Sequence, residues 1–239
     1  MLWEQFRNVN QQKLLMERLE TASEGKLEVT MPPINDVDEC FDLLDDDDAH
    51  VLYFYTHGYT RHRQADIGVG INLGLFISRY EKLKDDDPMR EHWKLLYDSI
   101  QQEQFEPDRS WIELSYGKLY LDELYDEIEK KLQSNPLVFL NMCESAQITP
   151  SLSDSFISFF LDRGAIGVIG TECPMTIEFA HPFAEKFLTA LLSGEKVGHA
   201  LLNARRHFID LKNPLGLAYT LFGSATTCFQ PPSIRVVGK

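Results

Sequence analysis

The sequence is poor in cysteine and in long apolar runs. Only four of its 239 residues are cysteines, and none has the C-x-x-C spacing of a zinc or redox site. Such a set is too sparse for a disulfide scaffold, so Cys40, Cys143, Cys173 and Cys228 are expected to be free thiols. No stretch approaches the roughly 20 apolar residues that span a bilayer, and the start "MLWEQFRNVNQQ" lacks the order of a signal peptide. We therefore predict a soluble, cytoplasmic protein.

Basic residues are also scarce. The chain has 23 Lys and Arg against 37 Asp and Glu, a formal net charge of −14. Binding to a phosphate backbone needs clustered basic side chains, so nucleic acid is an unexpected partner. The aspartate runs at 45–48 and 85–87 lack the ligand spacing of an EF-hand and are typical of solvated loops. No metal or organic cofactor is implied.

What the sequence does contain is enough apolar material for one large core, with 44% hydrophobic and 11% aromatic residues. This length and composition predict a single domain over residues 1–239. Val51–Tyr55 and Leu137–Leu140 are apolar, β-rich runs, typical of central parallel strands buried on both faces. The fold class predicted is α/β, a mostly parallel sheet with helices on both faces. The other elements expected are helices at 3–19, 37–44, 88–104 and 121–132, a helix opened by the capping-box spacing at 151–154, two helices separated by Ser193-Gly194, and strands within 26–33, 110–114, 164–171 and 217–225.

Two reactive side chains follow the two apolar runs. His57 comes just after the first and Cys143 just after the second. Ligands of open α/β sheets bind beyond the carboxyl ends of the strands, so neighbouring strands would bring the imidazole and the thiol together. An imidazole that takes the thiol proton converts cysteine into a nucleophile. The pattern thus predicts a Cys-His dyad.

Gly58 supports this interpretation, because it allows close backbone approach and its N–H could stabilise an oxyanion together with that of Cys143. The alternative is structural: free cysteine is often buried, and a histidine at a strand end can simply satisfy a backbone group. Cys173 also follows an apolar strand, but Pro174 removes an amide there and no His-Gly pair accompanies it. Cys40 and Cys228 are expected on a helix face and in a strand core.

Several segments in order resemble the CHAT proteases, caspase-like cysteine peptidases related to separase. The resemblance rests on "YFYTHGY", "SWIELSYGKLYLDEL", "LVFLNMCESA", "FLDRGAIGVIGTECPM", "EKFLTALLSGEKVGHALLNARRHF" and "NPLGLAYTLFGS". It implies a caspase-hemoglobinase fold, with His57 as general base or carbonyl-positioning group and Cys143 as nucleophile. The amides of Gly58 and Cys143 would form the oxyanion hole. It also implies that a protein partner, of TPR or another type, controls the peptidase activity. The domain in residues 1–239 could lack the family's extreme N-terminal part.

One departure concerns specificity. Asn141 stands where metacaspases place an aspartate of their basic-residue pocket, so a requirement for arginine or lysine cannot be inherited from that motif. Glu144 and, better placed, Glu172 could instead receive a basic substrate side chain, because the strand ending at Glu172 is expected beside that of Cys143. An apolar pocket is the alternative.

The function predicted is therefore a cytoplasmic cysteine endopeptidase that cleaves a specific protein and is activated by a partner. A catalytically silent module of the same fold, serving protein–protein interaction, is the main alternative. A doubly wound domain that binds a small ligand at its strand ends is a third.

Overall fold

The computed structural model describes part of the chain: residues 2–23, 27–30, 36–44, 48–56, 58–59, 82, 90, 110–114, 116–142, 155–173, 175–229 and 234–238, with only the backbone for residues 2–10, 22, 30, 58–59, 177 and 238. Contacts divide the chain into two units, residues 1–60 with 110–239, and residues 61–109. Of the second unit only Lys82 and Arg90 are described, so the helix predicted at 88–104 lies outside the described residues. The single-domain hypothesis stays a prediction. All that follows concerns the first unit.

A six-stranded sheet forms the centre of this unit, in the order β1-β9-β2-β6-β7-β8. The strands are β1 (Leu27–Thr30), β2 (Val51–Phe54), β6 (Leu137–Leu140), β7 (Gly167–Thr171), β8 (Tyr219–Gly223) and β9 (Ile234–Gly238). Every neighbouring pair is parallel except β7 and β8, which are antiparallel. The mostly parallel sheet predicted from the apolar runs is confirmed.

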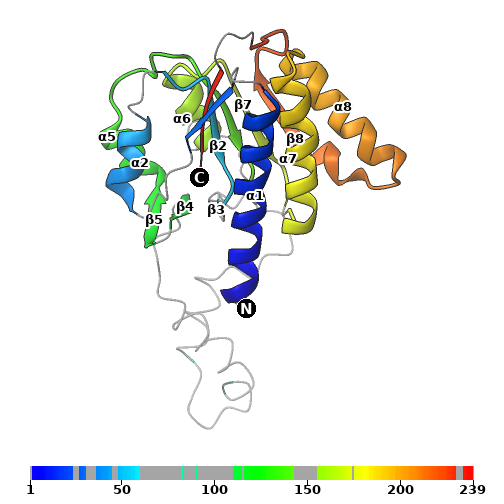
Figure 1. Cartoon of the computed structure of the whole chain (residues 1–239). Coiled ribbons are helices and arrows are strands. Elements are labelled where there is room, and N and C mark those ends of the chain that lie inside the picture. Colours follow the sequence, from blue (N-terminus) through cyan, green and yellow to red (C-terminus); the bar gives the residue numbers. More distant parts are fainter. Residues whose placement is uncertain are drawn as a thin grey trace. The chain divides into compact units, whose positions relative to one another are not determined.

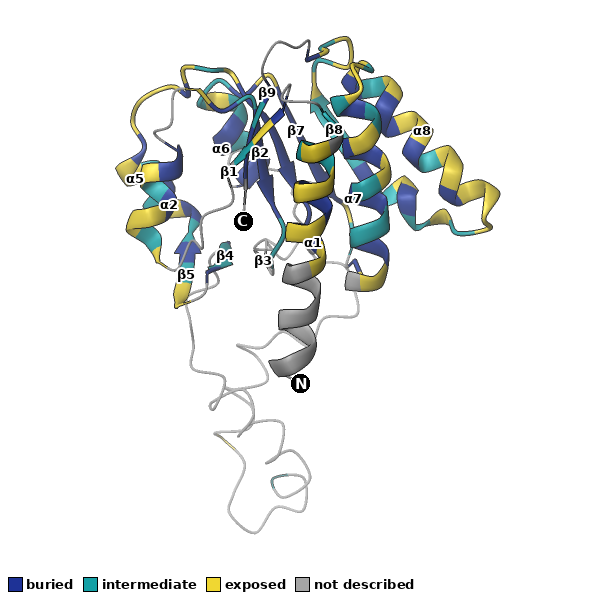
Figure 2. Cartoon of the chain, viewed as in Figure 1, coloured by how far each residue is buried: buried dark blue, intermediate teal, exposed yellow. Residues whose placement is uncertain are grey.

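Helices cover both faces of the sheet (Figure 1). One group consists of α1 (Leu2–Ala22), α7 (Ile177–Leu192) and α8 (Val197–Asp210), and the other of α2 (Val37–Leu44), α5 (Leu121–Glu127) and α6 (Phe156–Asp162). The alternation of side chains along β2 separates two cores: Val51 and Tyr53 pack with α7 and α8, whereas Leu52 and Phe54 pack with α2, α5 and α6. Figure 2 shows these strands as the buried layer between exposed helix faces.

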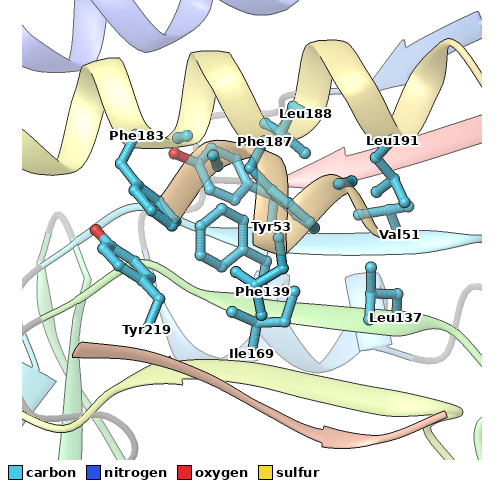
Figure 3. Packing of buried hydrophobic residues seen from close by; sticks show 14 of the residues in the cluster. Val51, Tyr53, Leu137, Phe139, Ile169, Phe183, Phe187, Leu188, Leu191 and Tyr219 are labelled. Atoms are coloured by element: carbon cyan, nitrogen blue, oxygen red, sulfur yellow. The ribbon is translucent and has the colours of Figure 1, made fainter. Parts of the chain in front are cut away.

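Aromatic side chains fill the core between the sheet and α7 (Figure 3). Phe139 of β6 lies at its centre, with ring centroids 5.2 Å from Tyr53, 5.2 Å from Phe187 and 5.9 Å from Tyr219. Phe183 of α7 stacks on Tyr219 at 3.8 Å and 6° between the ring planes. These contacts tie β2, β6 and β8 to one helix.

A small antiparallel sheet was only partly predicted. It consists of β3 (Gly58–Tyr59), β4 (Trp111–Leu114) and β5 (Gly117–Tyr120), paired in that order. The sequence pattern predicted β4, a turn and a helix over 121–132, but not β5. The helix α5 begins at Leu121 as predicted, and it ends at Glu127 rather than at Leu132. Its last turn has no basic residue to favour the helix dipole, and Ile128 leaves helical geometry with ψ of 80°.

Three other expectations need correction. The helix predicted to open at 151–154 begins at Phe156, where the Ser155 side chain accepts the Ser158 N–H at 3.2 Å. The last predicted strand is preceded by a short 3₁₀ helix, η2 (Pro214–Ala218), and a further strand, β9, was missed. Cys228, expected in a strand core, is exposed and outside any strand. Cys40 is buried on α2 as expected.

Candidate functional site

The two strands that precede His57 and Cys143 are direct neighbours. β2 and β6 pair in parallel with Phe54 opposite Leu140, and the Asn141 N–H continues the ladder by donating to the Phe54 carbonyl at 2.8 Å. The chain therefore leaves both strands at the same edge of the sheet. In the sequence, His57 lies three residues after Phe54, and Cys143 lies three residues after Leu140. His57, Cys143 and Glu144 all lie outside the described residues.

The described residues next to them are held by hydrogen bonds. The Thr56 hydroxyl donates to the Glu113 carbonyl at 2.7 Å, which ties the chain after β2 to β4. The Thr171 hydroxyl donates to the Met142 carbonyl at 2.6 Å, which ties the chain after β6 to β7. Gly58, a predicted oxyanion-hole residue, lies in β3 opposite Ile112. The backbone entering each predicted catalytic position is thus fixed by a neighbouring strand.

Beneath these strand ends lies a buried polar cluster centred on Asn141, which is only 2% exposed. The Asn141 side-chain nitrogen donates to the Tyr53 hydroxyl at 3.0 Å and to the Ala180 carbonyl at 3.2 Å. Its side-chain oxygen accepts from the Tyr219 hydroxyl at 2.7 Å. Both N–H groups and the oxygen of the Asn141 amide are therefore engaged within the protein.

The cluster continues to the helices through Gln12, a buried residue of α1. The Tyr53 hydroxyl donates to Oε1 of Gln12 at 3.0 Å, and Nε2 of Gln12 lies 2.8 Å from Nδ1 of His181. Since Oε1 accepts from Tyr53, Nε2 is the donor to His181, whose Nδ1 must then be unprotonated. Burial raises the pKa of Tyr53 and raises that of Tyr55 to about 12, so both phenols stay protonated at neutral pH.

Protonation of the His181 imidazole should make the stability contributed by this cluster depend on pH. Burial lowers its pKa below the ordinary value of 6.5; the nearby Glu185 opposes the shift and Arg18 adds to it. Below about pH 6.5 the unfolded chain takes up the proton more readily than the folded one, so stability should fall as pH drops towards the folded pKa and then level off. We expect the urea midpoint to decrease more between pH 7.5 and 5.5 in the wild type than in His181→Gln.

The exposed histidine His199 provides the control for this measurement. His199→Gln should keep the pH dependence of the wild type. If the urea midpoint of His181→Gln changed with pH as much as that of the wild type, His181 would not be the group responsible for the pH dependence.

Glu172 follows β7, the strand beside β6, as predicted. Its side chain is exposed and accepts a hydrogen bond from the Thr220 hydroxyl, and its N–H donates to the Ala218 carbonyl at 2.9 Å. Burial lowers the pKa of the Arg205 guanidinium, and the Glu172 carboxylate opposes that shift. The Glu172 carboxylate is therefore accessible to solvent, but it already interacts electrostatically with Arg205.

The described part of the chain shows neither a metal cluster nor a membrane-spanning helix. Among its side chains, no group of three or more His, Cys, Asp or Glu is arranged to hold a metal ion. None of the helices it contains combines the length and the apolar character needed to cross a membrane.

The chain is also similar in sequence to known proteins. The model of the CHAT domain family matches residues 11–222. A protein of Vitiosangium sp. (strain GDMCC 1.1324), named a probable protease, is 38% identical over 105 residues. That match covers 41% of this chain and 13% of the relative, so the chain corresponds to a small part of that protein.

Proposed function

Because the chain belongs to the CHAT domain family, whose fold is caspase-like, we propose that it is a cysteine endopeptidase with Cys143 as nucleophile and His57 as general base. The observation that carries this proposal is the parallel pairing of Phe54 with Leu140, from which both residues follow at the same spacing. The name of the partial relative, a probable protease, supports peptide-bond hydrolysis. The free thiols of the described cysteines fit a reducing compartment, and we place the reaction in the cytoplasm.

The chemistry needs only groups of the chain, a peptide and water. His57 takes the Cys143 proton, and the thiolate sulfur attacks the scissile carbonyl carbon. The N–H groups of Gly58 and Cys143 stabilise the resulting oxyanion. The intermediate collapses to a thioester on Cys143, while the imidazolium gives its proton to the departing amine. A water molecule, deprotonated by His57, then hydrolyses the thioester and releases the free thiol.

A peptide carrying a thiol-reactive group tests this proposal directly. Incubation with the protein, followed by mass spectrometry, should place the label on Cys143, and His57→Ala should remove it. Cys173, which is partly buried, and Cys228, which is exposed, are internal controls for unspecific thiol labelling. A folded protein whose Cys143 reacts no faster than Cys228, even with its partner present, would instead be a silent CHAT-fold module for protein–protein interaction.

For specificity we propose a preference for a basic residue before the cut, recognised by Glu172, with Glu144 as the second candidate carboxylate. The support is the exposed carboxylate of Glu172 on the strand beside β6 and the acidic field of the chain. We expect Glu172→Gln to lower kcat/KM for peptides with Arg or Lys at this position about tenfold, and to leave Leu and Met peptides unchanged. Preferred cleavage after Leu or Met, insensitive to Glu172→Gln, would contradict the assignment.

We also propose that the isolated chain is latent and is activated by a protein partner, of TPR or another type. An active endopeptidase free among other proteins would be hazardous, so a resting state with low activity is expected. A partner can activate only by binding the competent arrangement better than the resting one. We expect the segment 60–87, which follows His57 and contains Gly68, Gly70 and Gly74, to act as the gate. Apart from Lys82 it lies outside the described residues.

The latency is measured by comparing the purified chain alone with the same chain plus the protein that copurifies from its native cells. We expect peptide cleavage to rise at least about tenfold with the partner. Full activity of the monomer, unchanged by the partner, would rule out this form of control.

A further inference from the structure

We propose that Asn141 is a positioning residue, whose buried amide fixes the carboxyl ends of β2 and β6 and thereby aligns the two reactive side chains that follow them. This inference rests on the proposed function, since it assigns a role in the same site. The residues that do the positioning all lie in the described part of the chain: Asn141, its partners Tyr53 and Tyr219, and Gln12, which accepts from Tyr53.

The place of Asn141 in the fold makes it a junction. It is the first residue after β6, and its N–H donates to the last carbonyl of β2, that of Phe54. Its side chain bonds to Tyr53 of β2, to the Ala180 carbonyl of α7 and to Tyr219 of β8. One residue therefore connects three strands and a helix, two positions before Cys143.

The orientation of the amide is fixed by its partners. Both N–H groups and the oxygen of Asn141 are used, and rotating the amide by 180° would place its oxygen against the Ala180 carbonyl. Tyr53 and Tyr219 are fully buried, so any of these groups left without a partner would lose its hydrogen bond without gaining one to water. The cluster thus specifies a single arrangement.

The same arrangement restrains the backbone that leads to the nucleophile. On one side the Asn141 N–H is held by Phe54, and on the other the Met142 carbonyl is held by the Thr171 hydroxyl. Cys143 is the next residue. Catalytic groups that act together are sensitive to displacements of about 1 Å, so a looser Asn141 should change the reactivity of Cys143 without contacting it.

Two variants and one matched control test this role. Asn141→Leu removes the amide, and Tyr219→Phe removes one donor while keeping the ring that stacks on Phe183. Leu191→Val trims the same core at its other end, beside Val51, where no polar group is involved (Figure 3). Comparing variants at equal loss of thermal stability separates positioning from general weakening of the core.

The first measurement is the pH profile of iodoacetamide alkylation at Cys143, resolved from the other thiols by mass spectrometry. In both test variants its midpoint should move up towards that of a free thiol, about 8.5, with a rate at pH 7 reduced about tenfold or more. The second is deuterium uptake by peptides covering 51–59 and 137–146, which should rise. Leu191→Val should change neither the alkylation profile of Cys143 nor the deuterium uptake of these peptides.

The outcomes distinguish this inference from the proposed function. If wild-type Cys143 titrates as a free thiol even with the activating partner present, the proposed dyad fails, and deuterium uptake alone decides whether Asn141 positions the strand ends. If both test variants match Leu191→Val in deuterium uptake and alkylation, Asn141 only stabilises the core, and the positioning role is overturned.

Discussion

Replacing Cys143 by alanine should reduce peptide-bond cleavage at least about 1,000-fold, because no other group can form the thioester. His57→Ala should have an effect of similar size, since the thiol then keeps its proton at neutral pH. The double variant should lose no more than the stronger single one, because residues that act as one unit fail together. The measurement is kcat/KM with a peptide substrate, for the chain with its activating partner.

The controls are the other thiols and the fold itself. Cys173→Ala and Cys228→Ala should retain activity, and both site variants should unfold at the wild-type urea midpoint, because they lie beyond the strands rather than within them. Near-normal turnover in His57→Ala would show that the dyad assignment is wrong.

The central strands β2 and β6 could be predicted because their sequences are compatible with few other secondary structures. Leu137–Leu140 is a four-residue apolar run between Pro136 and Asn141, too short for a buried helix, and it forms β6 with the predicted bounds. The predicted run Val51–Tyr55 likewise forms β2, which ends one residue earlier, at Phe54. Since strands of a parallel sheet end at one edge, the position of the candidate site followed from their adjacency.

The missed strands carry weaker local signals. β9 comes from the last residues of the chain, where Ile234, Val236 and Val237 are buried only because β1 and β2 flank them on both sides. β5 is a strand of four residues that includes Gly117 and Lys118, and it depends on pairing with β4. In both cases pairing between distant segments, rather than the propensity of the residues, determines the structure.

The polar cluster around Asn141 could not be predicted from the sequence either, because only packing brings its members together. Gln12 is one of several polar residues in the first helix, and only packing shows that it faces inward. The available signal was Asn141 directly after an apolar run, where a buried polar side chain needs partners. Those partners come from positions 12, 53, 180 and 219, which no spacing rule connects.

Phe139 is the ring at the centre of the core between the sheet and α7. It is fully buried, and its neighbours Tyr53, Phe187 and Tyr219 are fully buried as well. It lies edge-on to Phe187 and Tyr219, with interplanar angles of 79° and 68°, which is a favourable geometry for aromatic pairs. Two of these neighbours belong to the polar cluster, so the core also supports the strand ends.

Phe139→Ala should therefore lower the free energy of unfolding by about 3–5 kcal/mol, because it removes a buried ring and leaves a cavity that β2, β6 and α7 cannot close. Against a total stability of about 5–15 kcal/mol, this change is large enough to unfold part of the population at 37 °C. Urea denaturation followed by circular dichroism gives the measurement. Leu202→Ala, on the outer face of α8 and 40% exposed, is the control and should change stability by less than about 0.5 kcal/mol. A loss below about 1 kcal/mol in Phe139→Ala would contradict the close packing of this core, since removing a ring from a close-packed site costs about 3–5 kcal/mol.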